Sequence, residues 1–254
     1  MKTIVITGAG SGIGRATAKV LAKTAGVTLL LVGRNEKSLL ETKLQLDRSE
    51  EHMLATLDIR DAAAWKNVLQ TNKAETLNIA GVFANAGVGG ENHYGPTDRW
   101  SDIISTNLDG TYVTIMELLP YLKISDEPFR SIVITSSCLA RFGVSHYTAY
   151  CTAKSGLLGL AKSLAMELAS DKILVNAICP GWVETDMAKA GIQKLADRQS
   201  DSYEKAFAEQ LSFVPLNRIS QPEEIGQLVR FLMSNEQTSI TGQGIDINNG
   251  SYMI

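Results

Sequence analysis

Short apolar runs alternate with longer segments of helical periodicity from one end of the chain to the other. Runs of about four to eight apolar or β-branched residues predict buried strands, whereas apolar residues three or four apart among charges predict amphipathic helices. The predicted strands are residues 3–7, 27–32, 53–57, 79–84, 131–136, 173–178 and 244–247. The predicted helices are residues 14–23, 35–48, 62–72, 100–119, 150–169 and 222–234. Pro120 is expected to end the fourth of these helices.

The repeating order of strand and helix predicts the α/β class, with a doubly wound parallel sheet of about seven strands and helices on both faces. Most predicted strands are apolar throughout, as a sheet covered on both sides requires. No linker interrupts the pattern, so residues 1–254 are expected to form a single domain. Residues 184–216 are the exception, because they are polar and follow a strand end, where a lid over a site would lie. Their helical patterns, such as residues 203–211, equally fit plain surface helices.

Composition excludes several classes of protein. A chain of 254 residues buries about three-quarters of its unfolded surface and needs no disulfide staples. The net charge of −3 lacks the basic excess of a nucleic-acid-binding domain. Three cysteines, an odd number without zinc-site spacing, indicate buried reduced thiols and a cytoplasmic protein. The three histidines, His52, His93 and His146, form no metal-spaced cluster, so no metal is expected.

No segment of the sequence is typical of a membrane or secretory protein. The longest apolar runs fall far short of the roughly 18 residues that a membrane helix requires. The N-terminal residues reach Gly8 without the apolar core of a signal peptide. Neither membrane insertion nor export is therefore expected.

A glycine-rich loop joins the first predicted strand to the first predicted helix. It reads T-G-x-x-x-G-x-G, with Gly8, Ser11, Gly12, Ile13 and Gly14 as its candidate cofactor contacts. Glycines let the main chain approach a pyrophosphate closely, and the helix N-terminus offers free N–H groups with partial positive charge. A tight structural turn is the alternative. The position after the first strand of an alternating chain favours nucleotide binding.

The end of the second predicted strand indicates which nucleotide is bound. An acid there would hold an unphosphorylated ribose, but the chain has Arg34 instead. A guanidinium forms charge-assisted hydrogen bonds with a 2′-phosphate, so Arg34 favours NADP(H) over NAD(H). Two alternatives stay open: Arg34 paired with Glu36 or Glu41 on the surface, or NAD(H) bound through Asn35 or Glu36. At the end of the third strand, Asp58 is a candidate acceptor for the adenine amine.

A tyrosine and a lysine lie one turn apart at the start of a predicted helix. Tyr150 and Lys154 are four residues apart, so they share one face. An ammonium about 4 Å from a phenol favours phenolate by at most about 4 kcal/mol at an effective dielectric constant of 20. A nicotinamide cation would add to this effect, so we expect Lys154 and the cofactor together to lower the pKa of Tyr150 toward neutrality, as proton transfer prefers. Alone, the pair is equally typical of a surface helix.

Two further polar residues strengthen the chemical interpretation of this pair. Ser137 ends the fifth strand, and strand C-terminal ends are where open α/β sheets bind ligands. Its hydroxyl is a candidate donor to a substrate carbonyl, with a turn or cap as the alternative. Asn107 lies inside a predicted helix, where its amide would bend the helix and hold a water near Lys154. A solvated polar face is the alternative for Asn107.

These motifs, taken together and in this order, resemble the short-chain dehydrogenase/reductase family over essentially the whole chain. The resemblance implies a Rossmann-like fold and reversible hydride transfer between a nicotinamide cofactor and a carbonyl or secondary alcohol. It implies that Tyr150 is the general acid/base, that Lys154 lowers its pKa and holds the nicotinamide ribose, and that Ser137 orients the substrate. Asn107 would support a proton relay. The further cofactor contacts that it implies are Asn85, Ala86, Gly87, Pro180, Gly181, Val183 and Thr185. Ile59, beside Asp58 at the end of the third strand, is a candidate cofactor contact by its position alone.

Three positions depart from the family's pattern. Ala84 replaces the first of two asparagines, and Asn248-Asn249-Gly250 stands where Asp-Gly-Gly is common. These two changes bear on packing and subunit contacts. Ser11 occupies a position that is basic in some NADP(H)-dependent members, which leaves Arg34 as the residue that favours NADP(H).

The substrate is not defined by the sequence. His146, Tyr147, Trp182 and Met187 are candidate substrate contacts, with exposed loop positions or core packing as alternatives. The segment around Cys179 is similar to reductases of 3-oxoacyl thioesters and polyketides. The expected partner is a small carbonyl or alcohol, and the resemblance implies a homo-oligomer, either a tetramer or a dimer. The rival hypothesis is a nucleotide-sensing protein without catalytic activity. Loss of Ser137, Tyr150 or Lys154 would favour it, but the chain has all three residues.

Overall fold

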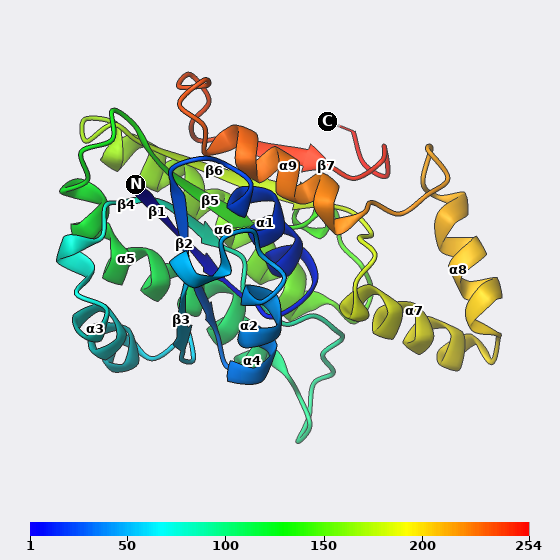
Figure 1. Cartoon of the computed structure of the whole chain (residues 1–254). Helices are drawn as coiled ribbons and strands as arrows, with labels where there is room; N and C mark the ends of the chain where they lie inside the picture. The colour runs from blue at the N-terminus through cyan, green and yellow to red at the C-terminus, as the bar shows by residue number, and fades with distance from the viewer. Residues whose placement is uncertain (254) are drawn as a thin grey trace.

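The computed structural model describes residues 1–253, which form a seven-stranded parallel sheet between two layers of helices (Figure 1). The strand order is β3-β2-β1-β4-β5-β6-β7. The strands are β1 Lys2–Thr7, β2 Val27–Gly33, β3 Met53–Thr56, β4 Ile79–Ala84, β5 Arg130–Thr135, β6 Ile173–Pro180 and β7 Gly244–Ile247. The order reverses direction between β1 and β4, so the predicted doubly wound, Rossmann-like arrangement is confirmed.

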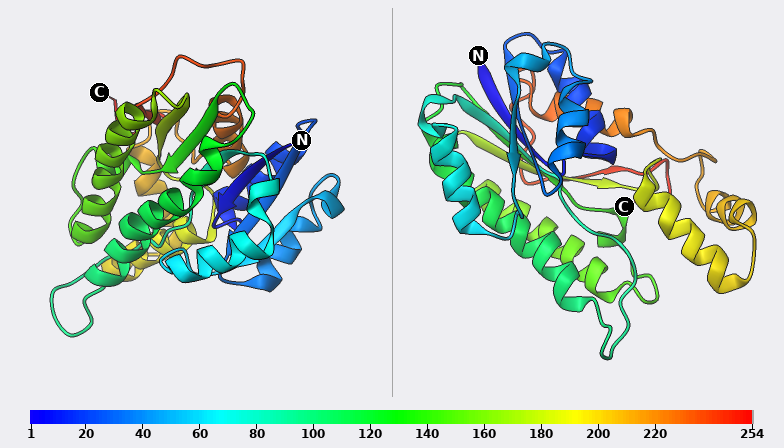
Figure 2. Two further views of the ribbon diagram at one scale, coloured as in Figure 1. Left: turned by 90° about the vertical axis from the view of Figure 1, so that its left-hand side faces the viewer. Right: turned by 60° about the horizontal axis from the view of Figure 1, so that its bottom comes forward.

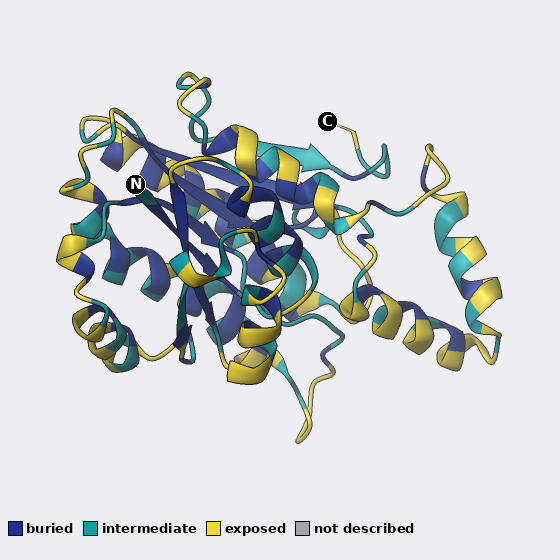
Figure 3. Cartoon of the chain, in the orientation of Figure 1, coloured by how far each residue is buried: buried dark blue, intermediate teal, exposed yellow. Residues whose placement is uncertain are grey.

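The helices cover both faces of the sheet, as the apolar strands require (Figures 2 and 3). The α-helices of residues 1–253 are α1 Gly12–Ala22, α2 Glu36–Lys43, α3 Ala62–Thr71, α4 Trp100–Ile104, α5 Gly110–Lys123, α6 Thr148–Leu168, α7 Asp186–Gln199, α8 Tyr203–Ser212 and α9 Pro222–Leu232, of which α7 and α8 project away from the sheet. Along β1, Ile4 and Ile6 pack against α1 and α9, whereas Val5 faces the core formed with α3, α5 and α6. This alternation between two apolar cores explains why the centre of the strand, residues 4–6, is apolar at three successive positions.

The predicted helix at 100–119 is wrong in two respects. It consists of α4, a π-helical turn at Ser105–Asp109, and α5, and it continues past Pro120 to Lys123. Pro120 is exposed, so the lost N–H bond faces water. Leu122 is fully buried in the core, and its packing holds the last turn in helical form.

The predicted helix at 35–48 is too long, because α2 ends at Lys43. Leu44 is 69% exposed while Leu46 is 6% exposed and joins the core. The chain therefore turns after α2 to bring Leu46 inward, and Arg48 follows in a left-handed conformation with φ 54°.

Residues 184–216 form helices α7 and α8, which project from the α/β body (Figure 2). Their shared core contains Ile192, Ala196 and Ala206, with Trp182 and Phe207 packed against it. This cluster is separate from the two cores of the sheet. The helix pair therefore has the packing of a small unit of its own.

Candidate active site

The glycine loop has the backbone that its sequence requires. Gly8 and Gly12 adopt positive φ angles of 67° and 49°, which side chains disfavour. A Cβ on Gly14 would collide with the carbonyl group of Gly8, and one on Gly8 would lie 2.9 Å from the Cα of Ala86. Glycine therefore keeps a tight loop against the start of the β4–α4 connection, and α1 begins directly after Ser11.

A pocket of about 240 Å³ opens beside this loop, at the carboxyl ends of β1, β2 and β3. Seven residues predicted from the sequence line it: Gly8, Ser11, Arg34, Asp58, Ile59, Ala86 and Gly87. The lining also contains Gly10, Gly33, Asn35, Ser38, Leu39, Leu57, Val88 and Thr106. Glycines, a cation and small apolar groups in one cleft fit the adenosine end of a dinucleotide.

Arg34 is exposed at the rim of this pocket and forms no ion pair within residues 1–253. Glu41, one of its two possible partners, instead pairs with Arg15 at 3.5 Å. Asn35 is occupied as well, because its Oδ1 accepts from the amide of Ser38 at the start of α2. Arg34 is thus a cation with space for an anion beside it.

Asp58 lines the same pocket, and its carboxylate is held by Arg60. Asp58 Oδ2 accepts from Arg60 Nη2 at 2.7 Å, and Oδ1 accepts from Nε at 3.0 Å. The hydrogen bonds from Arg60 keep the pKa of Asp58 below its ordinary value, despite partial burial. The group is therefore an ionised acceptor at the pocket edge.

Thr106 was missed by the sequence analysis. Its side chain is 7% exposed and lines the pocket, and its Oγ1 has no hydrogen-bond partner in the part of the chain described. A buried hydroxyl without a partner is costly, and it suits a ligand in the cleft. The sequence gives no sign that Thr106 contacts a ligand, because threonine is common on buried helix faces.

Asn85 acts as a link between strands. Its Nδ2 donates to the carbonyl of Thr7 at 3.1 Å, and its Oδ1 accepts from Thr135 Oγ1 at 3.2 Å. The amides of Asn85 and Ala86 both donate to Thr7 Oγ1. These bonds fix the ends of β1, β4 and β5 around the cleft.

Ser137, Tyr150 and Lys154 converge at the end of β5. Ser137 is buried and follows this strand, while Tyr150 lies in the first turn of α6. The Lys154 ammonium is 5.5 Å from the centre of the Tyr150 ring and donates to the carbonyl of Thr135 at 2.8 Å. The structure therefore brings together the three side chains that the sequence singled out.

The pKa of Tyr150 differs from the prediction. Burial raises it to about 12, and a side-chain hydrogen bond with Ser137 only partly offsets this effect. Burial also lowers the pKa of Lys154 to about 8. In the polypeptide alone, loss of water around the phenol outweighs the hydrogen bond with Ser137, so the acidification expected from Lys154 and a nicotinamide cation together is not present without the cofactor. Tyr150 is a protonated phenol at neutral pH.

Asn107 is completely buried in the π-helical turn. Its Oδ1 accepts from the amide of Val88 at 2.8 Å, and its Nδ2 donates to the carbonyl of Val88 at 2.8 Å. A Cβ on Gly87 would lie 2.7 Å from Asn107 Oδ1 and 3.7 Å from Lys154 Nζ. Asn107 thus fixes the β4–α4 connection beside Lys154. The helix is irregular at Asn107, as expected, because residues 105–109 form a π-helical turn.

The segment after β6 closes over the glycine loop. Thr185 caps the N-terminus of α7, and its methyl group lies 3.1 Å from where a Cβ on Gly12 would be. Gly181 leaves room for Asn248, which a Cβ would meet at 3.0 Å. Pro180 ends β6, and Val183 is buried in the core of the sheet. Contacts of this segment therefore reach both the cofactor loop and the C-terminal residues.

The four candidate substrate contacts occupy different surroundings. Tyr147 lies edge-on to Tyr150, with ring centres 6.3 Å apart. Met187 is half exposed, with its sulfur 3.0 Å from the Cβ position of Gly89, so it adjoins the β4–α4 connection. Trp182 instead packs in the core of the α7–α8 pair.

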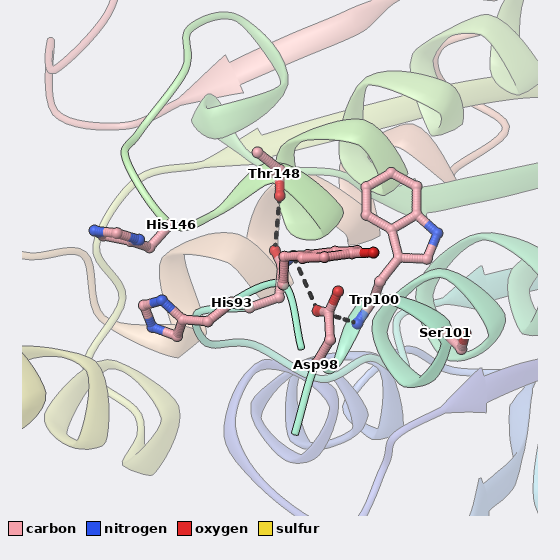
Figure 4. A pocket seen from close by; sticks show the side chains of 8 residues that line it. His93, Asp98, Trp100, Ser101, His146 and Thr148 are labelled. Atoms are coloured by element: carbon pink, nitrogen blue, oxygen red, sulfur yellow. Dashed lines mark hydrogen bonds between the residues drawn. The ribbon is translucent and has the colours of Figure 1, made fainter. Parts of the chain in front are cut away.

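The fourth candidate, His146, does not lie against Tyr150. Its ring centre lies 4.6 Å from that of His93, with the two rings tilted by 39°, in a groove whose lining does not include Tyr150 (Figure 4). No cluster of three or more potential metal ligands occurs in residues 1–253. Over the same range, no helix has the length and apolar character needed to cross a membrane.

Comparison with known proteins agrees with this geometry. A family model described as enoyl-(acyl carrier protein) reductase matches residues 8–251. The chain is 32% identical to the 3-oxoacyl-[acyl-carrier-protein] reductase FabG of Escherichia coli, over 100% of this chain and 98% of that protein. It is 33% identical to a putative ketoacyl reductase of the monensin polyketide synthase from Streptomyces virginiae, covering 98% and 96% of the two chains. The chain belongs to the short-chain dehydrogenase/reductase family.

Solved structures of this family superpose on the whole chain. A single-residue variant of the actinorhodin polyketide ketoreductase, with NADPH, matches with a TM-score of 0.91 and 30% identity, covering 98% of this chain and 97% of that one. A 3-oxoacyl-[acyl-carrier protein] reductase with bound NAD from Brucella melitensis matches with a TM-score of 0.84 and 28% identity, covering 100% and 92%. This short-chain dehydrogenase/reductase is therefore an NAD(P)-dependent oxidoreductase acting on carbonyl or CH–OH groups.

Proposed function

We propose that this enzyme uses NADPH to reduce the ketone of a 3-oxoacyl-type substrate, with Tyr150 as the proton donor. The observation that carries the proposal is the convergence of Ser137, Tyr150 and Lys154 beside a cleft with an unpaired arginine. The ketoacyl reductases among its relatives support the substrate class. Consumption of NADPH that depends on an added 3-oxoacyl thioester tests the proposal.

The residues present fit a dinucleotide. The glycine loop leaves room for a pyrophosphate, Thr106 lines the pocket with a hydroxyl that has no partner in the described chain, and Asp58 offers an acceptor at the pocket edge. Arg34 would hold the 2′-phosphate, which favours NADP(H). One neighbouring structure contains NADPH and another NAD, so this preference rests on Arg34. When bound, the nicotinamide supplies the hydride.

The side chains of the chain itself handle the substrate oxygen and its proton. Ser137 and Tyr150 donate hydrogen bonds to the ketone oxygen and stabilise the negative charge that develops there. Because Tyr150 is protonated at neutral pH, it gives its proton to this oxygen as the carbonyl is reduced. Lys154 lies against the Tyr150 ring and stabilises the phenolate left behind. Asn107 would support a proton relay through water near Lys154, and its bonds to Val88 fix the adjoining connection.

Residues 184–216 would act as the lid over this site. Met187 lies over the β4–α4 connection and Tyr147 adjoins Tyr150, so these two side chains would form the wall next to the ketone. The separate core of α7 and α8 suits movement as one unit. We further place the enzyme in the cytoplasm as a homo-oligomer, on the strength of its free thiols and its family.

The pH dependence of reduction is expected to follow Lys154. Its pKa is lowered to about 8, so its ammonium is present below this pH and lost above it, whereas Tyr150 keeps its proton up to about pH 12. The kcat for ketone reduction should therefore fall as the pH rises through about 8. Steady-state rates on either side of this pH check the expectation.

The Lys154→Arg variant is the control, because its guanidinium stays charged throughout this range. Its overall rate is expected to be lower, but the fall near pH 8 should disappear. An unchanged alkaline limb in this variant would assign the titration to another group.

The Thr106→Val variant should lower the affinity for NADPH without lowering the stability of the free protein. The variant removes a buried hydroxyl that has no partner in the described chain, so the free protein should be as stable as the parent or more so. The affinity for NADPH should fall by about tenfold, the worth of one hydrogen bond of about 1.4 kcal/mol. Thermal unfolding with and without NADPH measures both effects. Equal affinity in the two proteins would remove Thr106 from the cofactor site.

A further inference from the structure

Asn92 is a buried residue in an exposed loop. The connection between β4 and α4 projects from the molecule, and its neighbours His93 and Tyr94 are exposed. Asn92 is only 8% exposed, and both the oxygen and the nitrogen of its side-chain amide are engaged. It lies at the wall of a groove of about 860 Å³, between this connection and the first residues of α4 and α6 (Figure 4).

Asn92 caps the helix that carries Tyr150 and Lys154. Its Oδ1 accepts from Ala149 N at 2.9 Å and from Thr148 Oγ1 at 3.0 Å. The residue preceding α6, Tyr147, provides no side-chain cap of its own. A helix N-terminus has free amides that need acceptors, so Asn92 supplies from a distant loop what the local sequence lacks. The main-chain amide of Asn92 also donates to the carbonyl of His146 at 2.8 Å.

The same side chain reaches the helix that leads to Asn107. Asn92 Nδ2 donates to Asp98 Oδ1 at 3.3 Å, and this oxygen accepts from the amide of Trp100 at 3.0 Å, at the first residue of α4. Figure 4 shows Asp98 and Thr148 directed at the same point between the two helices. Asn92 and Asp98, here called the Asn92–Asp98 bridge, thus cap α6 and α4 together.

We infer that the Asn92–Asp98 bridge is a positioning device for catalysis, which holds the first turn of α6, and with it Tyr150, in register with α4 and Asn107. Tyr150 is one residue after Ala149, the residue whose amide Asn92 binds. A small shift of that turn moves the phenol relative to the ketone oxygen, and such misplacement lowers kcat without weakening cofactor binding. The inference rests on the proposed role of Tyr150.

Asn92→Ala tests the inference. It removes both acceptor bonds to α6, so kcat with a 3-oxoacyl thioester should fall by about 10- to 100-fold. The dissociation constant for NADPH should stay at the parent value, because the pocket beside the glycine loop does not include Asn92. Amide hydrogen exchange should become faster in residues 148–154. Ser101→Ala is the matched control, since Ser101 lines the same groove on the α4 side and is exposed.

An exchange of the two side chains provides the rescue. In Asn92→Asp/Asp98→Asn, a carboxylate at position 92 accepts from the same two donors of α6 and is favoured at a helix N-terminus. The amide at position 98 can donate to it and still accept from Trp100. The double variant should recover most of the lost kcat and the slow exchange, whereas Asn92→Asp alone places two carboxylates together and should remain impaired.

The outcomes separate the bridge from the proposed function. The inference would be overturned if Asn92→Ala kept the kcat and the amide hydrogen exchange rates of the parent. It would also be overturned if the double variant recovered neither the kcat nor the slow exchange of residues 148–154. If Tyr150→Phe kept full turnover, the proposed function would fail instead, and the exchange rates of residues 148–154 would still decide whether the bridge fixes α6.

Discussion

Replacing Tyr150 by phenylalanine is expected to lower kcat for ketone reduction by about 10²- to 10⁴-fold, the usual contribution of a positioned general acid. The substitution removes only the hydroxyl, and the ring keeps its contacts with Tyr147 and the Lys154 ammonium. The affinity for NADPH should therefore remain close to that of the parent. Rates of NADPH consumption with a saturating 3-oxoacyl thioester provide the measurement.

Tyr147→Phe is the matched control for this loss. Tyr147 is a second phenol next to the site, with its ring centre 6.3 Å from that of Tyr150. If only Tyr150 donates the proton, Tyr147→Phe changes KM more than kcat. Equal losses of kcat in the two variants would contradict a special role for Tyr150.

Arg34→Asp is expected to reverse the cofactor preference. The guanidinium is exposed at the pocket rim without an ion-pair partner among residues 1–253, so a 2′-phosphate would gain charge-assisted hydrogen bonds from it. Losing a bond to a charged group costs about 1.5–3 kcal/mol, so the dissociation constant for NADPH should rise by about tenfold or more. A carboxylate at this position repels the phosphate and adds to the loss. The dissociation constant for NADH should change little.

Lys37→Asp controls for the general effect of charge near the pocket. Lys37 is exposed on α2, close to Arg34 in sequence, and does not line the pocket. The same reversal of charge should alter NADPH binding only slightly there, because exposed charges are screened by salt. A parent enzyme that binds NADH more tightly than NADPH would contradict the NADP(H) proposal. In that case a residue other than Arg34 would select the cofactor.

Local patterns in the sequence predicted the fold because the sheet is apolar on both sides. Most strands of the central sheet contain a short apolar run, and their alternation with helices predicts a parallel sheet covered on both faces. The errors occurred where long-range packing overrides local signals. Leu122 holds a helix beyond an exposed Pro120, and the burial of Leu46 ends α2 early.

The chemical residues of the site were predictable, but their surroundings were not. Tyr150 and Lys154 are one helical turn apart in any helix, and Ser137 follows a strand, so their meeting follows from local structure. The pKa of Tyr150 depends on how completely the fold removes water from the phenol, which spacing does not reveal. Asn92 likewise gives no sign of its role, because Ala149 is 57 residues away.

Transfer of isotope from cofactor to substrate tests the central claim most directly. The enzyme is incubated with a 3-oxoacyl thioester and NADPH deuterated at the transferable C4 position, and the product is analysed by mass spectrometry. A hydroxyacyl product that carries deuterium on the former carbonyl carbon, formed by the parent and greatly reduced with Tyr150→Phe, is the predicted result. Tight binding of NADPH without deuterium transfer to this ketone would contradict the proposed ketone reductase and favour a nucleotide-binding protein without catalysis.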